Sequence, residues 1–389
     1  MAAETLYSKE KVEKTFRECR YALKGSAFDP AMSRGRRYQE DRDSPFFGIM
    51  DPFELDTWKI RQSKAHRRAG NKTQVLACQT NDHIRSRLNH EEEVGSNATL
   101  MARILGLNVH YVSAVAEGHD DWHFPFGHIG EVVLSELASE RLGYPVKLKH
   151  EKYALFGAQH IERNGRGLNL MYETLVGIGM HSRNDRPING EKTMINEIEL
   201  VVYNDKLSYL FADYNDIRRH PRWGPNFRYA SIEELGRNQT ERVQTVMAAI
   251  LEESARKGRV SFSEGEVFEK FEDARLYMWK NVYNQIDWDM HASQLKHVYG
   301  ILDQLFGEAP FIDPVVLLSI MTDKDIGELI EYSKKLRRLE DALSLTSAWD
   351  IIPSLYNRQF NYLIPDLDWA HRKPDEDREP GTAACLVPA

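Results

Sequence analysis

One short stretch of the chain, EGHDDWHFPFGHIGE at residues 117–131, combines imidazoles and carboxylates with aromatic side chains. The residues in it that could do chemistry are His119, Asp120, His123, His128 and Glu131. A neutral imidazole and a carboxylate together suit a divalent metal of intermediate hardness, and either group can also move a proton. The stretch therefore indicates a metal site or an acid–base site, although an adjacent His–Asp pair also occurs as an ordinary surface hydrogen bond.

Two residues elsewhere in the chain extend the metal hypothesis. His90 lies in RLNHEEEV, and Asp205 lies in VVYNDKLSY, within an otherwise apolar stretch of helical pattern. An acid on such a stripe has to be paired or bound to something. Together with the His119–Asp120 pair, these side chains suit manganese, iron, nickel or zinc, and magnesium less well. Composition leaves this site and simple hydrogen bonding as equal alternatives.

His128 and Glu131 are three residues apart, so on a helix they share one face. A carboxylate beside an imidazole fixes its tautomer and raises its basicity, as a general acid or base requires. The alternative is an ordinary ion pair at the start of a helix.

A second helical face carries polar groups at steps of four residues. Asp205, Tyr209 and Asp213 lie on it, with Lys206 beside them. The neighbouring residues are largely apolar, which leaves little polar surface elsewhere on this segment. The face is either the wall of a pocket or a solvated surface, and the sequence favours neither.

Residues 62–90 form a basic segment in an acidic protein. The segment has one acid, Asp82, against the cations Lys64, Arg67, Arg68, Lys72, Arg85 and Arg87. Arg87 precedes His90 by three residues, so it lies one turn away on the same helix face. Such cations could bind a polyphosphate near a metal, whereas the simpler alternative is a basic surface loop.

The segments that must position these residues have the sequence pattern of helices. Clear alternation typical of strands is scarce, with weak candidates at 144–152 and 259–262, so we expect an all-α fold. The chain has 389 residues, 42% of them hydrophobic and 28% charged, with a net charge of −8, which excludes a disordered chain and a generally basic nucleic-acid coat. The predicted helical segments are 86–107, 129–142, 196–214, 231–257, 265–286 and 324–346.

The expected organisation has four parts. They are an N-terminal arm with a basic loop (1–54), a catalytic core (55–220), a helical C-terminal region packed on that core (221–373) and a disordered tail rich in proline and charge (374–389). The apolar runs are too short to span a bilayer, so no membrane association is expected. Three scattered cysteines and a charged N-terminus without a signal-peptide pattern predict a reducing, cytoplasmic location.

Four motifs in order resemble the HD-domain metal-dependent phosphohydrolases, and more closely their dGTPase-like branch, the deoxynucleoside triphosphate triphosphohydrolases. RQSKAHRRAGNKTQV is similar to the pattern SxAFRRLxxKTQV, and RSRLNHEEEV is similar to RTRLTHSLEV. EGHDDWHFPFGHIGE resembles GHDIGHPPFGHxGE, and YNDKLSYLFADYND resembles ADDIAYxxHDxxD. DRDSPF at 41–46 and GLNLMYETLVG at 167–177 also resemble blocks in the right order, so the resemblance covers about residues 36–217. It implies an HD-domain helical bundle with a helical C-terminal extension.

The resemblance also implies roles for individual residues. One divalent metal, manganese or magnesium with iron, nickel or zinc as alternatives, would be held by His90, His119, Asp120 and Asp205. The catalytic residues would be His128, its partner Glu131 and the phosphate-contacting His123. The substrate contacts would be Arg87 and Lys206 at the phosphates, Tyr209 and Asp213 at the deoxyribose, and Gln74 at the 3′-hydroxyl.

The chain departs from the family pattern at several positions. His66 stands where a phenylalanine is usual, Asn89 replaces a threonine, and Glu91 replaces a serine beside the first metal histidine. Lys206 replaces the second acid of the bacterial pattern, and Trp122-His123-Phe124-Pro125 replaces Gly-His-Pro-Pro. The metal and phosphate positions are kept, whereas the base-reading residues do not map. Asp121 has no assigned role.

The implied activity is hydrolysis of deoxynucleoside triphosphates to a deoxynucleoside and tripolyphosphate, by attack of water at the α-phosphate. The alternatives are an HD phosphohydrolase for another nucleotide (a monophosphate, a cyclic dinucleotide or an alarmone) and a regulatory protein with a silent site that binds a nucleotide or single-stranded DNA. The resemblance further implies a homo-oligomer, tetrameric or hexameric, and an activating nucleotide or single-stranded DNA.

Overall fold

A computed structural model describes residues 5–38, 45–46, 48–76, 81–182, 195–286, 288–307, 312–356, 367 and 369. This part of the chain is helical and contains no β-strand, only two isolated bridges, so the all-α prediction is confirmed. None of the described helices is both long and apolar enough to cross a lipid bilayer. The motif DRDSPF and the predicted tail fall mostly or entirely outside the described residues.

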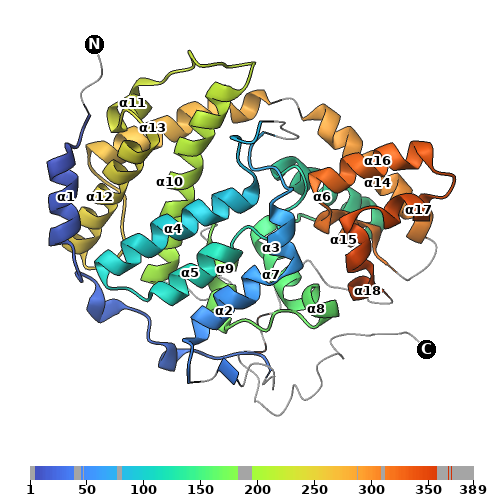
Figure 1. Ribbon diagram of the computed structural model, residues 1–389, viewed down its shortest axis with the longest axis horizontal. Coiled ribbons are helices and arrows are strands. Elements are labelled where there is room, and N and C mark those ends of the chain that lie inside the picture. Colours follow the sequence, from blue (N-terminus) through green and yellow to red (C-terminus); the bar gives the residue numbers. More distant parts are fainter. Residues whose placement is uncertain are drawn as a thin grey trace.

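Figure 1 shows the helices in chain order from blue to red. The α-helices are α1 Lys9–Glu18, α2 Pro52–Arg61, α3 Lys64–Ala69, α4 Arg87–Leu105, α5 Val109–Gly118, α6 His128–Leu142, α7 His150–His160, α8 Glu162–Gly165, α9 Tyr172–Met180, α10 Asn196–Arg219, α11 Ala230–Leu235, α12 Gln239–Lys257, α13 Glu266–Asn281, α14 Asp289–Phe306, α15 Pro314–Ile320, α16 Asp323–Lys335, α17 Leu339–Ser344 and α18 Ile352–Leu355. Short 3-10 helices are η1 Lys24–Ser26, η2 Pro30–Met32, η5 Tyr283–Gln285 and η6 Ser347–Ile351.

Helix α4, which carries His90, starts and ends at residues whose types favour a helix boundary. The Ser86 side chain accepts a hydrogen bond from the Asn89 backbone N–H, and the Asn89 side chain accepts one from the Ser86 backbone N–H, which satisfies two otherwise unpaired donors. Gly106 ends the helix in the left-handed conformation, with φ of 80°. The predicted segment 86–107 therefore matches α4 closely.

Two predicted helices are each divided into two α-helices in the structure. Segment 231–257 forms α11 and α12, because the chain turns at Gly236, where a Cβ atom would lie 2.5 Å from the Arg242 backbone nitrogen. Segment 324–346 forms α16 and α17, with Leu336 in an extended conformation after the basic last turn of α16. Hydrophobic periodicity continues through both breaks, so it did not reveal them.

Two hydrophobic cores meet at the segment 117–131. The first core joins α2, α4, α5, α9, α10 and the helices α12 and α13, and it includes Val94, Tyr111 and Phe211. The second joins α6 to α14–α17. Trp122 packs in the first core, whereas Phe124 and Phe126 pack in the second. The aromatic residues of the segment therefore anchor it between the two cores and hold its polar side chains in place.

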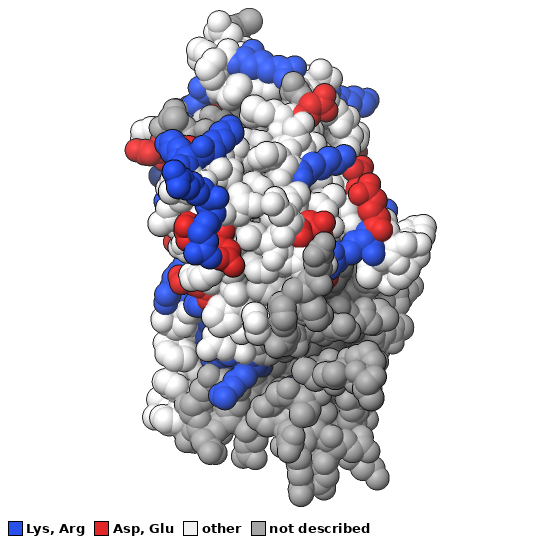
Figure 2. All heavy atoms as spheres, turned by 90° about the vertical axis from the view of Figure 1, so that its right-hand side faces the viewer, with Lys and Arg blue, Asp and Glu red and all other residues white. Residues whose placement is uncertain are grey.

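The C-terminal helices also fix the site segments through one buried carboxylate. Asp323, the first residue of α16, accepts hydrogen bonds of 2.7 Å from the backbone N–H groups of Thr73 and Phe126. On the outer face of α16 and α17, acidic and basic side chains are interspersed, as Figure 2 shows. Through the buried Asp323, these helices position the backbone at Thr73 and at Phe126.

Gly157 in α7 provides a test of this packing. A Cβ atom there would lie 2.1 Å from Cδ1 of Trp122, whose ring is buried and cannot move aside. We expect Gly157→Ala to lower the free energy of unfolding by about 1–3 kcal/mol, measured by urea denaturation. Gly300→Ala in α14 is the matched control, because nothing lies within 4 Å of its Cβ position, and it should leave stability unchanged or raise it by up to about 1 kcal/mol. Equal stabilities of the two variants would contradict the packing described.

Candidate active site

A cavity of about 350 Å³ lies where α4, α6, α10 and α13 approach the segment 117–131. The predicted site residues that line it are Gln74, Arg87, Asp120, His123, His128, Asp205, Lys206, Tyr209 and Asp213. His90, His119 and Glu131 are buried behind this wall. Residues predicted from separate motifs are thus brought to one place by the fold.

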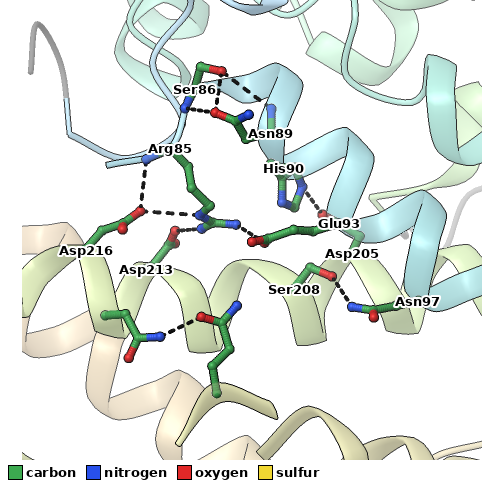
Figure 3. A network of polar contacts seen from close by, with 12 residues as sticks. Arg85, Ser86, Asn89, His90, Glu93, Asn97, Asp205, Ser208, Asp213 and Asp216 are labelled. Atoms are coloured by element: carbon green, nitrogen blue, oxygen red, sulfur yellow. Dashed lines mark hydrogen bonds and ion pairs between the residues drawn. The ribbon is translucent and has the colours of Figure 1, made fainter. Parts of the chain in front are cut away.

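Three of the four predicted metal ligands form a cluster. The distance from His90 Nε2 to Asp205 Oδ1 is 2.9 Å, and that from His119 Nε2 to the same oxygen is 3.8 Å. The three candidate ligand atoms all lie within 4.8 Å of one another. Figure 3 shows His90 on α4 and Asp205 on α10 pointing toward each other. Helices distant in the sequence therefore present two imidazoles and a carboxylate to a single point.

The chemistry of this cluster fits a metal ion. His119 Nδ1 lies 2.7 Å from the Ala116 carbonyl, which can only accept, so Nδ1 carries the proton and Nε2 presents a lone pair. His119 Nε2 is buried without a hydrogen-bond partner among the described residues. Burial lowers the pKa of His119 to about 4, so the imidazole is neutral at neutral pH. A neutral imidazole whose other nitrogen is held by a carbonyl is the usual arrangement of a metal-binding histidine.

Asp120, the fourth predicted ligand, lies beside the cluster and is hydrogen-bonded to Arg87. Its Oδ2 atom is 3.9 Å from His119 Nε2 and accepts from the Arg87 guanidinium, while its Oδ1 atom is 3.9 Å from His181 Nε2. Burial alone would raise the pKa of Asp120, but Arg87 and nearby histidines hold it well below its usual range. Asp120 is therefore ionised, and Arg87, which was predicted to contact phosphate, contacts this carboxylate.

A second histidine cluster lines the opposite side of the cavity. The ring centroids of His123 and His150 are stacked 4.5 Å apart, and His128 lies 5.6 Å from each of them. Glu131 accepts a hydrogen bond of 2.9 Å from His150 and contacts Lys149. Among the described residues, no hydrogen bond or ion pair joins Glu131 to His128. The predicted His128–Glu131 pair is thus replaced by a Glu131–His150 pair beside it.

These contacts shift the pKa values of His128 and His150 in opposite directions. Burial lowers the pKa of His128, and the charge of His150 lowers it further. Burial opposes the charged form of His150 as well, but the hydrogen bond that His150 donates to Glu131, together with nearby carboxylates, raises its pKa above the ordinary value. An imidazole with a lowered pKa beside one with a raised pKa can divide the roles of base and acid.

Sequence reasoning missed two histidines of the cavity. His150 begins α7, in the segment 144–152 that is a weak strand candidate, and His181 follows α9, outside the motifs that resemble the family. His181 Nδ1 lies 2.7 Å from the Ile178 carbonyl, which leaves its Nε2 facing Asp120. The His150-Glu151 dipeptide at a helix start was the available sign, but it lies far from the quoted motifs.

Arg85 holds the end of the α10 face in place, as Figure 3 shows. Its guanidinium contacts Asp213 and Glu93 at 2.6 Å and Asp216 at 3.3 Å. Burial raises the pKa of Asp213 to about 6, even though Arg85 opposes this shift. Asp213 also accepts a hydrogen bond of 2.8 Å from Tyr283. The predicted sugar-binding carboxylate is therefore already engaged by two partners.

Tyr209 and Gln74 both line the cavity, but only Tyr209 has a hydrogen-bond partner for its side-chain oxygen among the described residues. The Tyr209 hydroxyl accepts a hydrogen bond of 2.9 Å from Arg275, and burial raises its pKa to about 12, so it stays protonated. Gln74 Oε1 is buried without a hydrogen-bond partner among the described residues. Trp279 and Trp288 complete the cavity wall with aromatic surface.

Comparison with curated proteins places the chain among named relatives. Over 252 residues it is 34% identical to a deoxyguanosinetriphosphate triphosphohydrolase-like protein of Caldanaerobacter subterraneus, covering 64% of this chain and 69% of that protein. Proteins of the same name in Clostridium tetani (33%, covering 64% of this chain and 70% of that protein) and Desulfatibacillum aliphaticivorans (34%, 65% and 71%) are similar to the same extent. No protein-family model matches the chain. On these relatives, the chain belongs to the deoxyguanosinetriphosphate triphosphohydrolase-like family.

Proposed function

We propose that this protein hydrolyses deoxynucleoside triphosphates to a deoxynucleoside and tripolyphosphate. The observation that carries the proposal is the 350 Å³ cavity, which has the metal-binding cluster on one side and the histidine cluster on the other. Its walls also present the cationic side chains Arg87, Lys206 and Arg275. The names of the relatives support a triphosphohydrolase, while the substrate and the position of attack are our inference.

His90, His119 and Asp205, with Asp120 beside them, would hold one divalent metal ion. Such an ion neutralises phosphate charge and lowers the pKa of a bound water. Because the transferred group is strongly anionic, the remaining catalysis should come from positioning and electrostatics. His128 would exchange a proton near the leaving 5′-oxygen, and His123 would contact the α-phosphate. Glu131 would keep His150 charged, so that an imidazolium stacks on His123 beside the phosphates.

The sugar end of the substrate would lie toward α10 and α13. Gln74 Oε1, which has no hydrogen-bond partner among the described residues, would accept from the 3′-hydroxyl, and Tyr209 would pack against C2′ and exclude a 2′-hydroxyl. Trp279 and Trp288 offer flat apolar surface on which a base could stack. The base preference does not follow from these contacts, because aromatic stacking tolerates every base.

The pH dependence of catalysis tests the role of Glu131. Because Glu131 raises the pKa of His150, the charged form persists to a higher pH than for a free histidine and is lost as the pH rises through the raised value. In Glu131→Gln this support is lost, so we expect the alkaline limb of kcat/KM to move to lower pH, measured as a pH–rate profile. A change in kcat without a shift of that limb would leave Glu131 with a structural role only.

A regulatory role is the second candidate, and one observation favours it. A separate cavity of about 450 Å³ is lined by basic side chains of the predicted basic segment together with Arg163, as an anionic ligand would require. A nucleotide or single-stranded DNA there would act as an activator of the enzyme, or as the sole ligand if the active site is silent. The tetrameric or hexameric assembly and the cytoplasmic location remain predictions from the sequence.

The deciding experiment is a substrate panel. The protein is incubated with each of the four dNTPs and each of the four NTPs, with manganese or magnesium, and the products are separated by ion-exchange chromatography. Release of tripolyphosphate from dNTPs but not from NTPs supports the proposal and the role of Tyr209. Release of pyrophosphate or orthophosphate would point to another HD phosphohydrolase, and binding without hydrolysis would point to the regulatory alternative.

A further inference from the structure

A second group of ligating side chains lies outside the lining of the cavity. It consists of His66 on α3, Glu91 on α4 and Asp121 after the end of α5. His66 Nδ1 lies 3.2 Å from Asp121 Oδ1 and 3.6 Å from Glu91 Oε2. The two carboxylate side chains are 0% exposed and the imidazole is 13% exposed. Neither the metal-binding cluster nor the catalytic histidines use any of these three residues.

The cluster has more buried acceptors than donors. Both oxygens of Glu91 and the Oδ2 atom of Asp121 have no hydrogen-bond partner among the described residues. Leaving a buried carboxylate oxygen without a donor is strongly unfavourable, and it is rare in folded proteins. A proton on His66 Nδ1 allows a hydrogen bond to Asp121 Oδ1. The other three carboxylate oxygens, two of Glu91 and one of Asp121, then remain without a donor among the described residues. Burial and the charge of Asp121 raise the pKa of Glu91 well above its usual range, so without an ion the two carboxyl groups would share a proton. A cation with more than one coordination position would satisfy these oxygens together.

The cations nearest to this cluster are engaged elsewhere. The charge of Asp121 acts on Arg68, but the Arg68 guanidinium donates a hydrogen bond of 3.5 Å to Glu162. Lys72 also interacts with the charge of Asp121, yet its ammonium donates to the backbone carbonyl of His123. Among the described residues, no lysine or arginine forms an ion pair with Glu91 or Asp121. Among the described residues, His66 is therefore the one side chain that balances the charge of the two carboxylates by contact, and against the effect of burial they raise its pKa to about 10.

We propose that His66, Glu91 and Asp121 bind a second divalent metal ion with a structural role. One imidazole and two carboxylates are a donor set that zinc, manganese or iron accepts. In a tetrahedral site with metal–ligand bonds of about 2.0–2.1 Å, ligand atoms lie roughly 3.3–3.4 Å apart, and the observed 3.2 and 3.6 Å fall on either side of that value. The remaining carboxylate oxygens are available for a bidentate contact or for a bound water.

The sequence departures noted above converge on this cluster. His66 stands where the family pattern has phenylalanine, and Glu91 where it has serine. Asp121 occupies the place of isoleucine in the pattern GHDIGHPPFGH. Three ligating side chains from three places distant in the sequence, all turned to one point, are explained together by a bound ion. Each would be destabilising on its own, because each buries a polar or charged group where the pattern has a small or apolar one.

An ion at this position would link three segments that carry the active site. Asp121 follows Asp120 directly, and Glu91 follows His90 directly, so both segments also bear ligands of the first site. His66 lies on α3, within the segment that leads to Gln74. The second ion would fix α3, α4 and the turn after α5 relative to one another. This property goes beyond the proposed catalytic function and does not depend on it.

The test counts bound metal per chain. Wild-type protein freed of metal is dialysed against zinc and analysed by elemental mass spectrometry, alongside His66→Phe, Asp121→Asn and Asp205→Asn. We expect two equivalents in wild type, one in each single variant and none in His66→Phe combined with Asp205→Asn. Cobalt titration of Asp205→Asn should give a visible absorption spectrum from the remaining site, which His66→Phe abolishes. His110→Phe, which removes an exposed histidine, is the matched control and should retain two equivalents.

The outcomes separate this inference from the proposed function. If His66→Phe or Asp121→Asn binds as much zinc as wild type, no metal is held at this cluster, and the three side chains share protons instead. If wild type binds one equivalent that is lost in His66→Phe but kept in Asp205→Asn, the second site stands and the first fails. One equivalent that is lost only in Asp205→Asn overturns the inference while leaving the proposed function intact. Asp121→Asn is nearly isosteric, so it decides the question if His66→Phe does not fold.

Discussion

Asp205→Asn is expected to lose the metal of the first site and to lower kcat by at least about 10³-fold, because the ion provides charge stabilisation that no side chain replaces. Asp205 Oδ1 is the atom that His90 Nε2 and His119 Nε2 both approach, at 2.9 and 3.8 Å. Asparagine keeps the shape but presents a neutral amide, so the variant should remain folded. The measurements are metal content, circular dichroism and steady-state turnover of dNTPs.

His128→Ala is the matched comparison for this result. His128 lines the cavity but lies in the other histidine cluster, so its removal should keep the metal and lower kcat by about 10²–10⁴-fold. The two variants should therefore be similarly inactive but differ in metal content. An active Asp205→Asn protein that contains no metal would contradict the proposed mechanism.

Arg85→Ala is expected to give the largest loss of stability, about 3–5 kcal/mol of unfolding free energy. The Arg85 side chain is 8% exposed and is the cation shared by Asp213, Asp216 and Glu93. Its removal leaves buried carboxylates without their main counter-charge. The loss should be measured by urea denaturation at neutral pH, together with kcat/KM, because Asp213 lines the cavity.

The pH dependence of the Arg85→Ala variant has a defined sign. The pKa of Asp213 is already raised to about 6, and loss of Arg85 should raise it further. A carboxyl group whose pKa is higher in the folded than in the unfolded state destabilises the fold as the pH rises above the unfolded value. The loss should therefore be smaller at pH 5 than at pH 8.

A matched arginine controls for the general effect of removing charge. Arg219 contacts the same Asp216 at 3.0 Å, but its side chain is 44% exposed. Arg219→Ala should therefore lower stability by at most about 1 kcal/mol. Equal losses in the two variants would show that burial of the Arg85 network is not the source of its stabilisation.

The helical fold and most of the cavity could be predicted from the sequence because both depend on local patterns. The α4 start follows from Ser86 and Asn89, and the steps of four residues put Asp205, Tyr209 and Asp213 on one face of α10. That face proved to be a cavity wall. The choice between wall and solvated surface could not be made earlier, since it depends on which helices cover it.

The pairings within the site could not be predicted, because they join elements through the tertiary fold. Helical spacing suggested a contact between His128 and Glu131, but Glu131 lies against His150 on α7. His181 reaches the cavity only because α9 ends beside Asp120. Asp121 had no role in the sequence, and its approach to His66 and Glu91 is visible only in three dimensions.

Hydrolysis of a dNTP in water enriched in ¹⁸O tests the central claim most directly. Attack of water on the α-phosphorus with release of the 5′-oxygen places the heavy oxygen in tripolyphosphate and none in the deoxynucleoside. We predict one ¹⁸O atom per tripolyphosphate, detected by mass spectrometry and by the isotope shift of its terminal phosphorus resonance. Label in orthophosphate or pyrophosphate, or in the 5′-hydroxyl of the deoxynucleoside, would contradict attack at the α-phosphate.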